Sequence, residues 1–393
     1  MSIRPLFTII IPTYKRPDFV ISALKSVLYQ DYSDYNILVS NNGACKNTKE
    51  KLLPYLNDKR IKYLETEQQL SMPQHWDFIT KNIVGQYFLI LTDRCVLKQG
   101  ALNFLSNYIS NKPQDIISWP WDIYVDETKV LIPPFKVSDN VLTIDSEEYL
   151  DKFAKTHIGV DFPMPRALNS CVRFDFLCKL VSKYEKLFIS ISPDVTFSLF
   201  CLMNSKSISY IENSLMVSYG LNTSNGGCIY ELNASHYLNT LSELDIFPSV
   251  PCKLPFLVNI MAQDFFSVAK ICHRDDLSKK YSWANYYIQM YNELDAKIVA
   301  KKLPQNEINR YKKEIDSSLL AQNKSIRDEV LYRRRYSFIL ILNKVIKRNI
   351  IHIVHSIFSG GLIHIYKALK VRLNKQITYQ TVFDAAGFHI DKI

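Results

Sequence analysis

Several motifs that mark common enzyme classes are missing from this chain of 393 residues. It contains no P-loop, no Gly-x-Gly-x-x-Gly fingerprint and no Gly-x-Ser-x-Gly elbow, so the sites that these motifs build are not predicted. Its eight cysteines include no Cys-x-x-Cys pair, and most of them lie in apolar stretches. They are therefore interpreted as reduced core residues, and not as a disulfide framework or a zinc site. No histidine cluster with metal-ligand spacing, internal repeat or low-complexity segment is present either.

What the chain does contain is typical of a folded protein. Hydrophobic residues make up 47% of it and charged residues 22%, which disfavours global disorder. The length predicts one large domain with an appendage. The first apolar run begins within the first ten residues, so we expect no secretory signal peptide and a cytosolic location.

The N-terminal residues show the pattern of one βαβ unit. Residues 7–11 (FTIII) form a continuous apolar run, which is typical of a strand buried on both faces of a parallel sheet. Pro12 ends that strand, and Pro17 suits the first turn of a helix. A second apolar strand over 37–39 leads into polar residues. Polar residues thus follow both strands, at the edge where open α/β sheets bind nucleotides.

The same alternation of strands and helices continues to about residue 120. Residues 87–95 (YFLILTDRC) predict another fully buried strand with a charged tip, and 116–119 predict a further one. The fold class is therefore α/β, with a mainly parallel sheet flanked by helices. Residues 231–330 are predicted to be mostly helical.

The two strand ends also resemble a known family. Pro12-Thr13-Tyr14-Lys15-Arg16 and the segment Ser40-Asn41-Asn42-Gly43 are similar to the start of the family 2 glycosyltransferases, which have the Rossmann-like GT-A fold. In that family, paired Asp or Asn residues follow the second strand, and the usual pair is acidic. The asparagines at these positions in this chain leave the base of the nucleotide open.

The resemblance implies a domain organisation and a set of nucleotide-binding residues. We expect a GT-A domain over 1–230, a helical extension over 231–330 and a basic amphipathic tail over 331–393. The residues that the resemblance assigns to the nucleotide are Pro12, Thr13, Tyr14, Arg16, Asn41, Asn42 and Asp93.

Asp93 lies at the tip of a predicted buried strand, where a carboxylate needs solvent, a metal or a cation. In the resembling family this strand ends in Asp-x-Asp, whose acids hold the ribose and a divalent metal. Here Cys95 replaces the second acid, and a thiol is a poor ligand for Mg²⁺ or Mn²⁺. Two alternatives follow: Asp93 supports the metal with water, or no metal is needed and Arg94 or Lys15 offsets the diphosphate charge. A solvated turn cap is the competing structural interpretation.

Asp194 is the candidate catalytic base. It follows Pro193 at the start of a predicted helix, in a segment where the family places its catalytic Asp. A positioned carboxylate can take the proton from an acceptor hydroxyl. The alternative is a plain helix N-cap, since Asp is a preferred cap residue. Arg166, Asn169 and Ser170 lie where the family lines the sugar and acceptor, and a lone His75 is interpreted as structural.

The C-terminal part carries the excess of basic residues. Residues 330–383 contain ten Lys and Arg and no Asp or Glu, which accounts for the whole net charge of +10. Apolar residues at helical spacing alternate there with lysines, as in helices that lie on anionic lipid. We therefore predict an anionic membrane surface as the partner of 331–376, ahead of packing on the body, and no nucleic acid.

Together these features predict an inverting glycosyltransferase that is cytoplasmic and peripheral on the inner face of the membrane. The expected donor is a nucleotide sugar, with a UDP-sugar favoured, and the expected acceptor is a lipid-linked glycan of a bacterial surface polysaccharide or lipopolysaccharide. Two other classes stay open. One is an inactive relative that binds glycans or scaffolds a complex, and the other is a nucleotidyltransferase.

Overall fold

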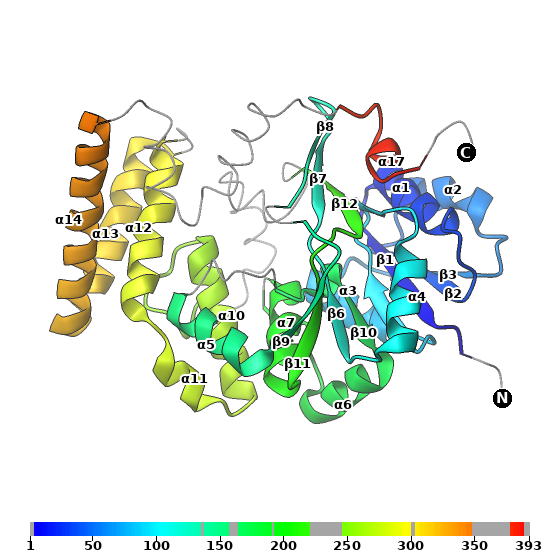
Figure 1. Ribbon diagram of the computed structural model, residues 1–393, viewed down its shortest axis with the longest axis horizontal. Helices are drawn as coiled ribbons and strands as arrows, with labels where there is room; N and C mark the ends of the chain where they lie inside the picture. The colour runs from blue at the N-terminus through cyan, green and yellow to red at the C-terminus, as the bar shows by residue number, and fades with distance from the viewer. Residues whose placement is uncertain are drawn as a thin grey trace. The chain divides into compact units, whose positions relative to one another are not determined.

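The computed structural model describes residues 4–134, 137–156, 164–190, 192–220, 246–299, 303–347 and 378–388 (Figure 1). The chain divides into two compact units. The first comprises Met1–Glu147, Pro163–Thr223 and Ile377–Ile393, and the second comprises Glu148–Phe162 and Ser224–Gln376.

The first unit is built on an eight-stranded sheet with the order β3-β2-β1-β4-β10-β6-β11-β9. The strands β3, β2, β1 and β4 run parallel, while β10 is antiparallel to both of its neighbours. The carboxyl ends of the parallel strands therefore lie at one edge. The strands are β1 (Phe7–Thr13), β2 (Tyr35–Asn41), β3 (Ile61–Glu65), β4 (Tyr87–Ile90), β6 (Ile116–Ser118), β9 (Val141–Asp145), β10 (Ser170–Arg173) and β11 (Ser207–Ile211).

Helices cover both faces of this sheet. Every residue of β1 is buried, as the apolar run predicts. On one face, α1 (Pro17–Leu28) and α4 (Ala101–Asn111) share a core with β1 and β2. On the other, Phe88 of β4 meets Phe197 of α7 (Pro193–Asn204), and Phe188 links that helix to α3 (Met72–Thr80). The unit also contains α2 (Lys46–Leu52), η1 (Leu53–Tyr55), η2 (Ala167–Asn169) and α6 (Phe174–Tyr184).

A second, four-stranded sheet has the order β5-β12-β7-β8. Its strands are β5 (Cys95–Leu97), β7 (Asp122–Val125), β8 (Val130–Ile132) and β12 (Met216–Tyr219). β12 pairs antiparallel with β5 and parallel with β7. Because β5 begins two residues after Asp93, this sheet fixes one side of the turn that carries that carboxylate.

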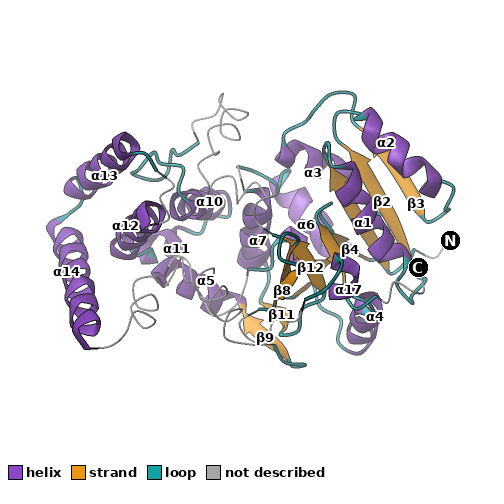
Figure 2. Ribbon diagram, turned by 90° about the horizontal axis from the view of Figure 1, so that it is seen from above, coloured by secondary structure: helices purple, strands orange, loops and turns teal. Residues whose placement is uncertain are grey.

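The last described residues pack on this second sheet. Residues 378–388 contain the short helix α17 (Val382–Ala385), which lies beside β8 and β12 in both views (Figures 1 and 2). The Tyr124 hydroxyl donates to the carbonyl oxygens of Tyr379 and Gln380 at 3.2 and 3.3 Å. Val382 and Phe388 are buried in a cluster with residues of β5, β7 and β12.

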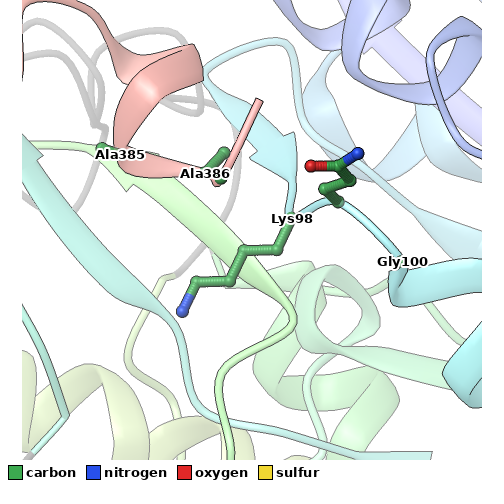
Figure 3. Close-up of a pocket in the computed structure, with 6 residues that line it drawn as sticks. Lys98, Gly100, Ala385 and Ala386 are labelled. Atoms are coloured by element: carbon green, nitrogen blue, oxygen red, sulfur yellow. The ribbon is translucent and has the colours of Figure 1, made fainter. Parts of the chain in front are cut away.

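The same segment meets the turn between β5 and α4. The Gln99 amide donates to the Ala386 carbonyl at 3.0 Å. Lys98, Gly100, Ala385 and Ala386 are among the residues that line a pocket of about 490 Å³. Figure 3 shows how these four residues lie. Residues more than 250 positions apart in the sequence thus share one packed region.

The second unit is helical where it is described. Its helices are α5 (Ser146–Thr156), which begins at the boundary, α10 (Leu257–Ile271), α11 (Asp275–Lys280), α12 (Trp283–Val299), α13 (Gln305–Leu320) and α14 (Lys324–Lys347). Aromatic rings fill its core, as between Phe265 and Phe153 or Tyr281. The Glu293 carboxylate accepts from the first amides of α10, Leu257 and Val258, and so satisfies that helix end. Within the described ranges, none of the helices has both the length and the apolar character needed to cross a bilayer.

The unit boundaries differ from the expected domains at two places. Residues from Glu148 to Phe162 group with the helical unit, although they lie inside the range expected for the GT-A domain. The last residues group with the first unit, because Val382 and Phe388 are buried on its second sheet. Residues 348–377, which include much of the segment predicted to bind a membrane, lie outside the described residues.

Candidate active site

Three residues from two parallel strand ends meet at the carboxyl edge of the sheet. The Thr13 hydroxyl, at the end of β1, donates to Asp93 Oδ2 at 3.0 Å. Arg16, the residue before α1, lies with its guanidinium 3.4 Å from Asp93 Oδ1. The backbone between them turns sharply, because Lys15 has a φ of +52°. A left-handed conformation is unfavourable for lysine and is often found at functional sites.

The Asp93 side chain is almost fully enclosed. The residue is only 5% exposed, and burial raises the pKa of its carboxyl. The Arg16 guanidinium and the Thr13 hydroxyl oppose that rise in pKa by stabilising the ionised form. The arrangement is a buried carboxylate held by one cation and one hydroxyl, and not a solvated turn cap.

The neighbouring Arg94 is engaged elsewhere. Its guanidinium donates to Ser218 Oγ at 3.0 Å and to the Tyr219 carbonyl at 3.1 Å, both in β12. Arg94 therefore ties the Asp93 turn to the second sheet. Lys15, the other cation considered for the diphosphate, is exposed, with its ammonium 5.1 Å from the centre of the Tyr14 ring.

Tyr14 is held at the surface of this edge by its hydroxyl, which donates to Gln69 Oε1 at 2.6 Å. The residue is only partly buried, so one part of the ring remains accessible. Pro12 is buried in the ladder opposite Ser40 and positions the residues that follow it. A fixed, partly exposed aromatic ring is a suitable surface for stacking of a flat base.

Asn41 and Asn42 lie at the end of β2 but are not equivalent. Asn41 is fully buried and donates to the Cys45 carbonyl and the Tyr63 hydroxyl, while its Oδ1 has no hydrogen-bond partner among the described residues. Asn42 donates to the Leu70 carbonyl at 2.9 Å and accepts from the Leu70 amide at 2.8 Å. Asn42 thus clamps the chain after β3, and its amide edge is used inside the protein.

These contacts of Asn42 explain why an acidic side chain at position 42 would lower the stability of the fold. Asn42→Asp replaces the amide donor with an oxygen that faces the Leu70 carbonyl, so the native hydrogen bond becomes a repulsion. We expect a loss of about 1–3 kcal/mol in the free energy of unfolding. Urea unfolding measures it, with exposed Asn47→Asp as the charge-matched control. Equal stability of the two variants would contradict the clamp.

His75 is a buried structural group in this arrangement. It is 4% exposed and lies 2.8 Å from Ser40 Oγ. Burial lowers the pKa of its imidazole to about 4, so the ring is neutral at physiological pH. The contact of His75 with Ser40 supports the end of β2. The neutral ring is not a general acid at neutral pH.

Asp194 lies in the first turn of α7. The N-cap of this helix is Ser192, so Asp194 is the second helical residue and not the cap itself. Its side chain is 13% exposed, and its Oδ2 lies 3.8 Å from the Arg166 guanidinium. That guanidinium also lies 6.0 Å from the centre of the Trp121 ring. The carboxylate is thus oriented by a neighbouring cation, and it can accept a proton from a hydroxyl group that binds next to it.

The other two residues predicted to line the sugar are buried supports. Asn169 is fully buried in η2 and donates to the carbonyls of Trp119 and Met164. Ser170 is 1% exposed and donates to the Arg166 carbonyl at 2.7 Å. Both residues shape the loop that presents Arg166. Since η2 packs against both β4 and α7, it links the Asp93 and Asp194 sides of the site.

The part of the chain that contains this edge of the sheet matches the model of a known protein family. Residues 8–167 match the model for glycosyl transferase family 2. The similarity to this family covers the part of the chain from β1 to the start of η2. Together with the sheet order and the helices on both faces, this match confirms the predicted GT-A fold. The helices α10 to α14 confirm the predicted C-terminal helical region.

Curated proteins with similar sequences are also glycosyltransferases. Over 70 residues the chain is 39% identical to an Escherichia coli K12 protein named "Putative colanic acid biosynthesis glycosyl transferase WcaA", covering 17% of this chain and 24% of that protein. Over 137 residues it is 28% identical to the uncharacterized glycosyltransferase MG025 of Mycoplasma genitalium, covering 33% and 44% respectively. The matched segments thus span less than half of these relatives.

Among solved structures, the chain is similar to residues 1–349 of TarS from S. aureus, whose structure was determined in complex with UDP-GlcNAc. The TM-score is 0.49 at 11% identity, with 81% of this chain and 93% of that one covered.

Mg²⁺ or Mn²⁺, which the family resemblance implies, does not fit the side chains of this edge. The Asp93 oxygens are engaged by Thr13 and Arg16. Cys95, at the position of the second acid, is 1% exposed in β5, and its sulfur accepts from the Thr92 hydroxyl. Among the described residues, no three His, Cys, Asp or Glu side chains are grouped to hold an ion.

Two contributors to the site were missed in the sequence. Gln69 fixes the Tyr14 ring, and Trp121 lies beside Arg166. The signal for Trp121 was available in the aromatic segment after residue 118, but Gln69 lies in a polar loop that shows no pattern of its own.

Proposed function

We propose that the chain is an inverting glycosyltransferase that transfers a sugar from a nucleoside diphosphate to a hydroxyl group of a glycan. The observation that carries this proposal is the buried cluster of Thr13, Asp93 and Arg16 at the carboxyl edge of a family 2 glycosyltransferase region. That edge is where α/β sheets of this type bind nucleotides.

For the donor, Tyr14 supplies the surface against which the base stacks, and Asp93 lies where the ribose would be held. The donor that we propose is a UDP-sugar, as in the resembling family. Asn42 takes no direct part in reading the base in this proposal, because both ends of its amide hold Leu70. Specificity for the base then depends on backbone groups of the loop that Asn42 and Gln69 hold in place.

For the transfer itself, Asp194 is the proposed base. The acceptor hydroxyl gives its proton to the Asp194 carboxylate while its oxygen forms a bond to the anomeric carbon. The bond from that carbon to the diphosphate oxygen breaks, and its electron pair leaves with the nucleoside diphosphate. Attack opposite the leaving group inverts the anomeric configuration. Arg166, 3.8 Å from Asp194, orients the carboxylate toward the acceptor side.

For the acceptor, we propose a lipid-linked glycan of a bacterial surface polysaccharide, reached from the cytoplasmic side of the membrane. Two observations support it: the basic, apolar composition of 331–376 and the colanic acid biosynthesis name of one relative. Co-sedimentation of the full chain with anionic and with neutral vesicles tests the membrane part. Equal sedimentation with both would contradict it.

The experiment that tests the donor site is a thermal-shift panel of UDP, GDP, TDP and CMP. A ligand at about 100 times its dissociation constant stabilises a fold by about 2.7 kcal/mol, which is a clear shift in melting temperature. We expect a shift with one diphosphate, and release of that diphosphate from the matching nucleotide sugar in the presence of an acceptor. No shift with any member of the panel would favour a glycan-binding scaffold instead.

A further inference from the structure

The donor edge holds a guanidinium where the family resemblance implies a metal ion. Asp93 is the only acid of the Asp-x-Asp position that this chain retains, and Arg16 lies 3.4 Å from its Oδ1. A divalent ion bound to this oxygen would have to displace the arginine. The second position offers a buried thiol, which is a poor ligand for hard cations.

We infer that Arg16 replaces the divalent cation at this site and binds the donor diphosphate directly. This inference rests on the proposed function, because it concerns the diphosphate of the same donor. A guanidinium has five N–H donors in a planar fork, and the contact with Asp93 uses one of them. The others suit two phosphate oxygens at once, which is the geometry that arginine provides and lysine does not.

The surroundings of Arg16 fit this role. Its side chain is 34% exposed, whereas that of Asp93 is only 7% exposed, so the guanidinium lies between the buried acid and the solvent side. Asp93 fixes the orientation of the guanidinium. Arg16 also immediately precedes α1, and the amino end of a helix attracts anions.

The alternatives considered from sequence are less suitable. Arg94 donates to Ser218 and to the Tyr219 carbonyl, so its guanidinium is held against β12. Lys15 is exposed beside Tyr14 and has no carboxylate to orient it in the contacts that the structure describes. Arg16 is therefore the cation that is both oriented and accessible.

The test measures the binding of the nucleoside diphosphate that the thermal-shift panel selects, by titration calorimetry on the full chain. Wild-type protein is titrated in EDTA and again with Mn²⁺. We expect the two affinities to agree within about twofold. Electron paramagnetic resonance of Mn²⁺, with the diphosphate present, should show no ion bound to the protein beyond that bound by free diphosphate.

Variants separate the charge of Arg16 from its geometry. Arg16→Gln should weaken diphosphate binding by about tenfold or more, and Mn²⁺ should not restore it. Arg16→Lys should recover only part of the loss. Arg60→Gln is the matched control, because Arg60 also pairs with an aspartate but precedes β3 at the opposite edge of the sheet. Circular dichroism and melting temperature verify that each variant is folded.

The possible outcomes are distinct. Binding that disappears in EDTA and returns with Mn²⁺ overturns the role of Arg16 and leaves the glycosyltransferase proposal standing. Binding that is equally strong in Arg16→Gln and wild type also overturns it. If no diphosphate binds under either condition, the proposed function fails, and the inference fails with it.

Discussion

Replacing Asp194 by asparagine is expected to lower sugar transfer by about 10²–10⁴-fold while donor binding stays nearly unchanged. Asparagine has the size and polarity of aspartate but cannot accept the acceptor proton. The carboxylate is the second residue of α7 and lies 3.8 Å from the Arg166 guanidinium, in a segment away from the Thr13 and Asp93 cluster. The loss should therefore appear in kcat and not in the affinity for the diphosphate.

The measurement is the steady-state rate with the true acceptor, together with diphosphate affinity and melting temperature. Asp18→Asn is a close control: α1 also begins with Pro-Asp, and Asp18 is an exposed acid in its first turn. Asp18→Asn should keep full activity. If Asp194→Asn transferred sugar as fast as wild type, the carboxylate would be only a helix-end residue and the base would lie elsewhere.

The GT-A core could be predicted because its signals are local. The apolar run before Pro12 predicted the strand that the structure shows as Phe7–Thr13, and Pro17 predicted the start of α1. The charged tip after residues 87–90 predicted a carboxylate at the sheet edge. Strand ends in a parallel sheet converge, so Thr13 and Asp93 meet although 80 positions separate them.

The roles of individual polar residues were harder to predict because they depend on partners from distant loops. Asn42 matched the family position for base recognition, yet its amide is used by Leu70, which β3 brings alongside. Asn169 matched a sugar-lining position, yet it is buried against carbonyls of the chain. A polar residue at a motif position therefore does not reveal whether it faces a ligand or its own backbone.

The position of the C-terminal residues was not predictable from their charge. The basic composition of 331–393 suggested a single tail, and nothing in residues 378–388 indicates where they pack. Their burial depends on Tyr124, Val96 and Val217, which belong to three strands of the second sheet. Such contacts arise only once that sheet has formed.

The packing of residues 378–388 on the second sheet predicts a large effect of truncation. Removing residues 378–393 exposes the cluster that Val382 and Phe388 cover, each of which is less than 5% exposed. Burial of two such side chains contributes roughly 3–6 kcal/mol, part of which the ordering entropy of the segment offsets. The truncated chain should therefore melt at a clearly lower temperature than the full chain.

Truncation should weaken donor binding as well as stability. The Gln99 amide, two residues after β5, loses its bond to the Ala386 carbonyl, and β5 carries the turn of Asp93. A synthetic peptide of residues 377–393, added as a separate molecule, should recover part of the stability and part of the donor affinity. The peptide can cover the same surface of the second sheet without being joined to the rest of the chain. The measurements are melting temperature and diphosphate affinity, with and without the peptide.

Point variants in the full chain separate the effect of this packing on the second sheet from other effects of removing residues 378–393. Val382→Asp places a charge in the cluster with β5 and β12 and should reproduce the loss of stability, since an unpaired buried carboxylate is costly. Gln380→Asp changes an exposed residue two positions earlier and should behave like wild type. If Val382→Asp and the truncated chain both kept the wild-type melting temperature, the segment would contribute nothing to the fold. If stability fell but diphosphate affinity did not, the packing of the C-terminal residues would stabilise the fold without affecting the donor site. The turn of Asp93 would then be held in position by the contacts of Arg94 with β12.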